Sequence, residues 1–326
     1  MKKRILGKSG FRVSEMGLGC WQLGGDFGPV SEDRSEAILR TAVESGIDFW
    51  DTADVYGGGM SERRIGQYLG ANPGKAIVAT KVGRSAGLFP NGYSKEKVRL
   101  SIQESASRLQ VDVVDLVQLH CVPLEVLRAG DILCWLEDFQ QEGLIRAFGA
   151  SVETIDEGMT VIDHPKLVSL QVVFNLFRQQ ATSRLFPAAQ ANDVGIIVRL
   201  PLASGVLGGK MTRGQRFAET DHRHYNRDGA FFSQGETFSG VPFDRAVDLV
   251  EEMRSWLPGG MSMAQMAMRW ILDHAAVSTV ITGATRPEQV LENAGVSELA
   301  PLPEALHRKL ADFFTEKVES SIVVEV

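Results

Sequence analysis

The chain has 326 residues, of which 44% are hydrophobic and 23% are charged, and this length suits one large α/β barrel or two medium domains. Its formal net charge of −7 argues against nucleic acid as a partner, because nucleic-acid binders present a basic face. No apolar run approaches the ~18 residues that suggest a membrane span, and no long apolar core follows the basic N-terminus as in a signal peptide. Three cysteines without metal-ligand spacing favour a reducing, cytoplasmic location.

The first half of the chain alternates short apolar runs with amphipathic segments. Residues 4–6 and 12–14 flank a glycine-containing turn and predict a β-hairpin. Ser31 and Ser94 each precede an apolar-periodic segment with acidic residues nearby, so we expect both to cap helices. The expected strands are 13–20, 47–52, 76–81 and 115–120, and the expected helices are 31–45, 62–69, 95–109 and 131–141.

The second half continues the same alternation. The expected strands are 144–151, 169–175, 195–200 and 278–282. The expected helices are 153–162, 182–192, 244–256, 262–273, 287–293 and 303–316. A long irregular segment, 201–241, separates the seventh strand from the helices that follow it.

Eight strands, each followed by at least one helix, predict an α/β fold of the (β/α)8 TIM-barrel type. We expect one domain over residues 1–326, with an N-terminal β-hairpin, extra C-terminal helices and a long loop after strand seven. The strands are almost wholly apolar, as expected for strands that are buried on both sides. The alternative is a doubly wound open sheet, which is disfavoured because no G-x-G-x-x-G follows an early strand.

Polar residues close three successive strands of the expected barrel. Asp51 ends strand two, Lys81 ends strand three and His120 ends strand four, while Tyr56 lies on the loop after Asp51. Taken singly, each residue has a structural interpretation: a loop cap, a surface lysine or a hydrogen-bonded core histidine. Barrels of this type place their active sites at the C-terminal ends of the strands. The convergence of all four residues on one rim therefore predicts a catalytic site.

Several motifs resemble the aldo-keto reductase superfamily, and they extend over nearly the whole chain. They are GLGCWQLGG at 17–25, GIDFWDTADVYGGGMSE at 46–62, IVATKVG at 77–83, DLVQLH at 115–120, PLASGVLGGK at 201–210 and ITGATRPEQVLEN at 281–293. The resemblance implies reduction of a small-molecule aldehyde or ketone, with sugar-like carbonyl compounds among the candidates. It assigns no metal.

The resemblance also implies a role for each residue of the tetrad. Tyr56 would be the general acid that protonates the carbonyl oxygen. A free phenol has a pKa near ~10, and Lys81 would lower it by favouring the phenolate. Asp51 would pair with Lys81, and His120 would orient and polarise the carbonyl through a hydrogen bond.

A nicotinamide cofactor is implied by the same motifs, with NADPH favoured and NADH also possible. Ser151 and Gln171 would bind the carboxamide. Two positions depart from the family pattern: Val152 stands where asparagine is usual, and Arg199 stands where an aromatic residue often stacks on the ring. The remaining residues implied at the nicotinamide end are Gly19, Cys20, Trp21, Asp51, Leu200 and Pro201.

The far end of the cofactor would be bound by two other motifs. In the pyrophosphate loop, glycines would allow close backbone approach and Lys210 would add positive charge. Arg286, next to Thr285, would serve the 2′-phosphate of NADPH. The residues implied here are Leu202, Ser204, Gly205, Leu207 and Lys210 in the first motif, and Gly283, Ala284, Thr285, Arg286, Gln289 and Asn293 in the second.

The substrate side is less specified. Candidate contacts are Trp21, Trp50, Phe89 and Phe177, and residues 211–241, which include His222, Arg223, His224, Tyr225 and Arg227, form either a lid or an insertion without substrate contact. Two other classes of function stay open: a slow-turnover regulatory protein that binds nicotinamide, and an unrelated barrel hydrolase or lyase acting through Asp51 and Glu62. The sequence leaves the oligomeric state open.

Overall fold

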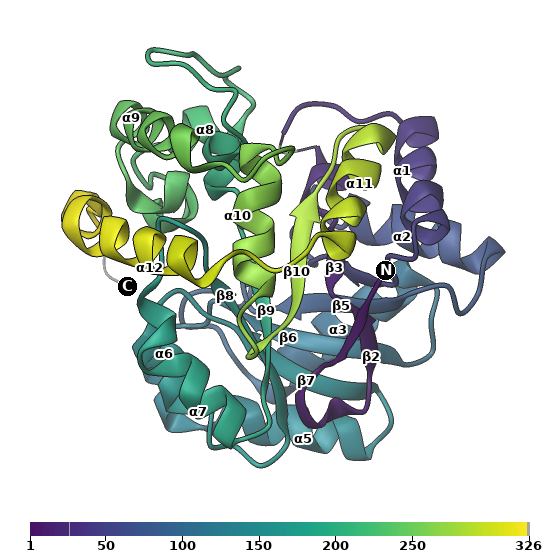
Figure 1. Ribbon diagram of the computed structural model, residues 1–326. Coiled ribbons are helices and arrows are strands. Elements are labelled where there is room, and N and C mark those ends of the chain that lie inside the picture. Colours follow the sequence, from purple (N-terminus) through teal and green to yellow (C-terminus); the bar gives the residue numbers. More distant parts are fainter. Residues whose placement is uncertain (26, 325–326) are drawn as a thin grey trace.

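The computed structural model describes residues 1–25 and 27–324. Eight parallel strands form a closed barrel in the order β10-β3-β4-β5-β6-β7-β8-β9, with helices around it (Figure 1). The strands are β3 Met16–Gly19, β4 Phe49–Asp51, β5 Ile77–Val82, β6 Val114–His120, β7 Ile145–Ser151, β8 Leu167–Val173, β9 Gly195–Arg199 and β10 Val277–Gly283. The predicted barrel is confirmed, and an open sheet is excluded because β10 pairs with both β3 and β9.

The helices follow the predicted alternation. Ser31 and Ser94 cap helices as expected, their side chains accepting hydrogen bonds from the backbone N–H of Arg34 and Lys97. The helices are α1 Glu32–Glu44, α2 Met60–Ala71, α3 Lys95–Leu109, α4 Leu124–Ala129, α5 Asp131–Gln141, α6 Ile155–Val161, α7 Leu185–Ala191, α8 His222–Tyr225, α9 Phe243–Met253, α10 Met263–Leu272, α11 Pro287–Gly295 and α12 Glu304–Phe313.

Several predicted elements differ in their bounds from the structure, including the strand expected over 13–20, of which the barrel strand covers Met16–Gly19. Helix α4 was not expected, because its six residues are too few to show a helical period. The helix expected over 182–192 divides into a 3-10 turn, Gln180–Thr182, and α7. Strand β8 ends at Val173, so Asn175 lies beyond the strand rather than on it.

The predicted N-terminal hairpin is present and closes the N-terminal end of the barrel. Its strands, β1 Lys3–Ile5 and β2 Arg12–Ser14, are antiparallel. Gly7, at the start of the connecting turn, has φ +47°, and a Cβ there would lie 2.4 Å from the carbonyl oxygen of Val168. Only glycine permits this close approach. The opposite, C-terminal end of the strands therefore remains available for a site.

The long segment after β9 contains short helical turns rather than being wholly irregular. They are η4 Ala203–Gly208, α8, η5 Gln234–Glu236 and η6 Phe238–Gly240. Among the residues that the structure describes, no helix is long and apolar enough to span a membrane.

Candidate active site

The four residues that close or follow strands two to four come together at the C-terminal rim. Lys81 Nζ, buried at the end of β5, lies 2.5 Å from Asp51 Oδ1 and 3.1 Å from the Tyr56 hydroxyl. It also donates to the Thr52 carbonyl oxygen at 2.8 Å. One ammonium group therefore makes three contacts, which offset the cost of burying its charge.

Lys81 does not lower the pKa of Tyr56 below its ordinary value, contrary to the expectation from the sequence. Burial of the phenol outweighs the opposing effect of Lys81 and raises the pKa of Tyr56 to about 12. Although burial favours the neutral amine, Asp51 raises the pKa of Lys81 above its usual range. Tyr56 is consequently a protonated donor and Lys81 a cation at neutral pH.

The second oxygen of Asp51 is held by two amides. Oδ2 of Asp51 accepts hydrogen bonds from Gln118 Nε2 at 3.0 Å and from Gln171 Nε2 at 2.7 Å. Gln171 also accepts a hydrogen bond from Ser151 Oγ at 3.3 Å. Both oxygens of the carboxylate are therefore hydrogen-bonded. Gln171, expected to bind the cofactor carboxamide together with Ser151, contacts the Lys81–Asp51 ion pair directly. Gln118 was missed because it lies inside a strand rather than at its end.

His120 lies against the edge of Tyr56, with ring centroids 5.9 Å apart at an interplanar angle of 88°. Burial, and then the cations Lys81, Arg84 and Arg199, hold the pKa of His120 well below its usual range. The imidazole is therefore neutral at physiological pH. Within the described part of the chain its Nδ1 is buried without a hydrogen-bond partner.

A cavity of about 330 Å³ opens beside these residues. Asp51, Tyr56 and His120 line it, and so do Thr285 and Gln289 from the predicted adenosine end. Other predicted cofactor residues on its wall are Gly19, Trp21, Ser151, Gln171, Arg199, Leu200, Pro201, Leu202, Ser204, Gly205, Gly283 and Ala284. The cavity therefore brings together most of the residues that the sequence assigned to a dinucleotide.

Five of the predicted cofactor residues lie outside the cavity wall. Cys20 and Leu207 are buried in the hydrophobic core, and Asn293 is buried in helix α11. Lys210 and Arg286 are exposed.

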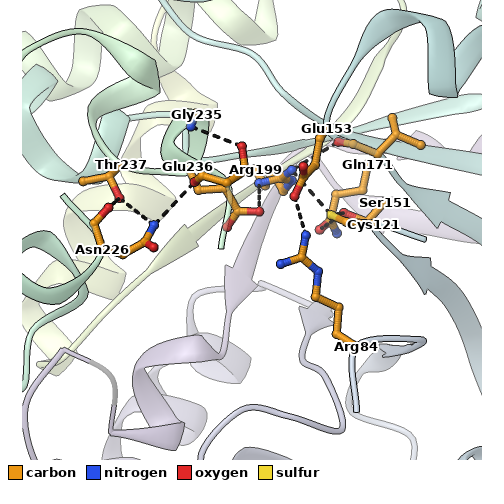
Figure 2. A network of polar contacts seen from close by, with 12 residues as sticks. Arg84, Cys121, Ser151, Glu153, Gln171, Arg199, Asn226, Gly235, Glu236 and Thr237 are labelled. Atoms are coloured by element: carbon orange, nitrogen blue, oxygen red, sulfur yellow. Dashed lines mark hydrogen bonds and ion pairs between the residues drawn. The ribbon is translucent and has the colours of Figure 1, made fainter. Parts of the chain in front are cut away.

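Arg199 does not replace an aromatic residue as a free stacking group, because a network of polar contacts holds its guanidinium (Figure 2). It pairs with Glu236 at 3.0 Å and donates to the carbonyl oxygen of Val152 at 3.1 Å. Although burial alone would do the opposite, Glu236 raises the pKa of Arg199. Val152, where the family has asparagine, therefore contributes its backbone to the same network.

A second ion pair lies beside the first. Arg84 pairs with Glu153, and Figure 2 draws this pair next to Cys121. The Sγ of Cys121 and one oxygen each of Glu153 and Glu236 lie within 4.8 Å of one another. Because each carboxylate has a guanidinium partner, the two positive and two negative charges of this cluster balance.

Three wall residues, Gln22, Phe27 and Cys121, were not predicted from the sequence. Arg223 and Glu236 also line the cavity, so the 211–241 segment, expected as a lid or an insertion, reaches its wall. Of the four aromatic residues expected to contact the substrate, only Trp21 lines the cavity, where it stacks on Tyr56 with centroids 5.7 Å apart. Trp50 and Phe177 are buried in the core, and Phe89 is exposed.

The hydrolase or lyase alternative requires Glu62 as a second carboxylate beside Asp51, and the structure does not place Glu62 there. Glu62 is buried away from the cavity, where it accepts hydrogen bonds from Thr80 Oγ1 at 2.5 Å and from Arg108 Nε at 2.6 Å. Both of its oxygens are therefore occupied, and it does not face Asp51 across the cavity.

Comparison with known proteins gives one family over almost the whole chain. The model of the Aldo/keto reductase family matches residues 15–313. A probable voltage-gated potassium channel subunit beta of Oryza sativa is 31% identical, covering 94% of this chain and 95% of the relative. L-galactose dehydrogenase of Arabidopsis thaliana is 30% identical, covering 92% and 89%. The structure resembles aldo-keto reductase AKR11C1 from Bacillus halodurans with a TM-score of 0.77 at 27% identity, covering 96% of each chain.

Proposed function

Because the chain belongs to the aldo/keto reductase family and is an NAD(P)H-dependent oxidoreductase, we propose that it reduces an aldehyde or ketone to an alcohol with Tyr56 as the general acid. The contact that carries this proposal is the 3.1 Å distance between the Tyr56 hydroxyl and Lys81 Nζ beside the cavity. When bound, the nicotinamide supplies a hydride to the carbonyl carbon. Residues of this chain carry out the remaining steps.

Tyr56 Oη donates its proton to the carbonyl oxygen, which becomes the hydroxyl of the alcohol. Lys81 stabilises the phenolate that remains, and Asp51 keeps Lys81 charged. His120 is neutral, so it donates a hydrogen bond to the carbonyl oxygen without giving up a proton. A later proton from solvent restores the phenol.

Ser151 and Gln171 fit the nicotinamide carboxamide, because one offers a hydroxyl and the other an amide oxygen at the cavity wall. Gly205 has φ +96° on the wall, which lets the backbone approach a phosphate without a Cβ in the way. We propose NADPH as the preferred cofactor. Exposed Arg286, next to Thr285 on the wall, is the cation available to the 2′-phosphate.

The proposed substrate is an oxygen-rich carbonyl compound such as a sugar. The polar wall formed by Cys121, Arg199 and Glu236 next to His120 supports it, and a relative named L-galactose dehydrogenase is consistent with it. Paired charges of both signs can donate to and accept from hydroxyl groups.

A second function, nicotinamide binding with slow turnover in a regulatory protein, is favoured by one observation. The relative from Oryza sativa is named a probable potassium channel subunit beta. The tetrad favours the reductase, since Lys81 contacts both Asp51 and the Tyr56 hydroxyl beside the cavity.

One experiment separates the two functions. Purified protein is assayed with NADPH and NADH against a panel of aldehydes, ketones and sugars, with Tyr56→Phe as the control. We expect wild-type turnover to exceed that of the variant by about 10²-fold or more, with the same NADPH affinity by calorimetry. A wild type as slow as Tyr56→Phe on every carbonyl would favour the regulatory protein.

A further inference from the structure

Arg178, in the turn after β8, is a buried cation that forms no ion pair with any residue that the structure describes. Only 4% of its surface is exposed, and its Nε and Nη1 are buried without a hydrogen-bond partner. Burial, and then the like charge of Arg199, lower the pKa of Arg178 to about 10, so the guanidinium is still charged at neutral pH. A buried charge without a partner is strongly destabilising.

The charges around Arg178 leave an excess of one positive charge. Glu153 is the partner of Arg84. Glu236 is the partner of Arg199. Among the described residues of this cluster, three guanidinium groups therefore share two carboxylates, and both carboxylates are already paired. A ligand that balanced the cluster would carry a single negative charge.

A cavity of about 20 Å³ lies beside Arg178 and is separate from the catalytic cavity, since the two share no lining residue. A single water molecule needs roughly 10–15 Å³, so the cavity admits one particle of about that size and excludes organic anions. Its walls are largely apolar, with Val152 and Val172 among them.

A second polar group without a partner belongs to the same cavity. Gln180 lines it, and the Oε1 of Gln180 is buried without a hydrogen-bond partner in the described chain. Rotation of the amide exchanges its oxygen and nitrogen, so the side chain can donate a hydrogen bond instead of accepting one. Glu153 also lines the cavity, but its charge is engaged by Arg84.

We propose that Arg178 binds a small monovalent inorganic anion, of the size of chloride, in this cavity. A water molecule could accept a hydrogen bond from the guanidinium, but only an anion would also balance its charge. The proposal does not depend on the proposed function, because the site takes neither the cofactor nor the substrate.

The anion would act on the wall of the catalytic cavity from behind. Nη1 of Arg178 lies 3.0 Å from the position that a Cβ would take at Gly235. Gly235 precedes Glu236, the partner of Arg199 (Figure 2). An anion at Arg178 would reduce the repulsion between the two arginines, and we expect it to stabilise the turn η5 against the barrel.

The test uses bromide as the probe, in protein without cofactor. Wild-type crystals soaked in sodium bromide should show an anomalous-scattering peak beside Arg178. In solution, thermal unfolding is compared in sodium chloride, sodium bromide and sodium methanesulfonate at equal ionic strength, because methanesulfonate is too large for the cavity. We expect both halides to raise the wild-type midpoint by about 2 °C over methanesulfonate. Arg178→Met should lose the peak and the shift, whereas Arg184→Met, which removes a mostly exposed arginine, should keep both.

Other outcomes overturn the proposal in distinct ways. Equal midpoints of the wild type in the three salts would mean an adventitious ion only, even with a peak in the crystal. A halide shift in Arg178→Met equal to that of the wild type would place the anion elsewhere. A peak that appears only in Glu325→Gln, a change outside the described residues, would give Arg178 a carboxylate of the chain as its partner. If Arg178→Met does not fold, the wild-type crystal decides, and the absence of bromide beside Arg178 rejects the site.

Discussion

The guanidinium of Arg199, at the end of strand β9, and the carboxylate of Glu236, in the turn η5, form an ion pair at 3.0 Å. The pair joins the barrel to a segment that starts two residues after β9 and returns over the cavity. Both side chains are nearly buried, with 10% and 16% of their surface exposed. The pair is one of the contacts that attach the long loop to the cavity wall.

Glu236→Gln should loosen this attachment. Arg199 would keep its contact with the Val152 carbonyl oxygen but lose its counter-ion, and truncating one partner of a buried pair costs about 3–5 kcal/mol at most. We expect faster hydrogen exchange in residues 234–241 and unchanged exchange in strand β5. If the double variant with Arg199→Gln is as loose as the sum of the single variants, the two residues are not coupled.

Lys81→Met should lower the free energy of unfolding, mainly because it removes the charge that pairs with Asp51 and not because it disturbs packing. Methionine fills the space but leaves the buried Asp51 carboxylate with only its two amide donors, at a cost of about 3–5 kcal/mol. Chemical denaturation would measure the loss. The double variant Asp51→Asn, Lys81→Met should recover part of it, whereas no recovery would mean that the unpaired charge is not the cause.

Carbonyl reduction should be nearly independent of pH between about pH 6 and 9. Tyr56 has its pKa raised to about 12 by burial, so its acid form is fully populated below that value. Alcohol oxidation needs the phenolate and should accelerate as pH rises. Profiles of kcat/KM in both directions would test this, and a reduction rate that falls with an apparent pKa near ~7 would contradict it.

Lowering the pH should reduce the free energy of unfolding, because the buried His222 becomes protonated. Burial lowers the pKa of His222 to about 4, whereas an unfolded histidine titrates near ~6.5. The folded pKa is depressed, so its contribution to stability is present above about pH 6.5 and is lost as pH falls towards 4, about 2 kcal/mol by pH 5. His222→Gln should reduce the dependence of unfolding free energy on pH by this amount, and an identical slope would show that other groups cause it.

Gly24→Ala should misplace Tyr56. A Cβ at Gly24 would lie 2.7 Å from the Gly57 nitrogen and 2.8 Å from the Tyr56 carbonyl carbon, so the backbone that carries the phenol must move. We expect kcat to fall on the order of 10²-fold with NADPH affinity kept. Gly87→Ala is the control, because nothing lies within 4 Å of its Cβ position; equal kcat values in the two variants would contradict the prediction.

The sequence by itself determined the barrel and the tetrad. Both depend on local patterns: apolar strands alternating with capped helices, and polar residues where strands end. Asp51, Lys81 and His120 meet because parallel strands present their C-terminal ends at one rim, so reading the end of each strand was sufficient to find them.

The tertiary structure alone decided which charges face the site. The segment after β9 has no periodic pattern, and its position depends on contacts between residues distant in the chain, such as Glu236 with Arg199 and Arg223 near Gly205. The sequence consequently assigned Lys210 to the cavity, whereas Lys210 is exposed and Arg223 lines the wall. The sequence also predicted that Lys81 would lower the pKa of Tyr56. In the structure, burial of the phenol raises this pKa by more than Lys81 lowers it. Burial depends on the folded structure, so the sequence alone did not reveal this effect.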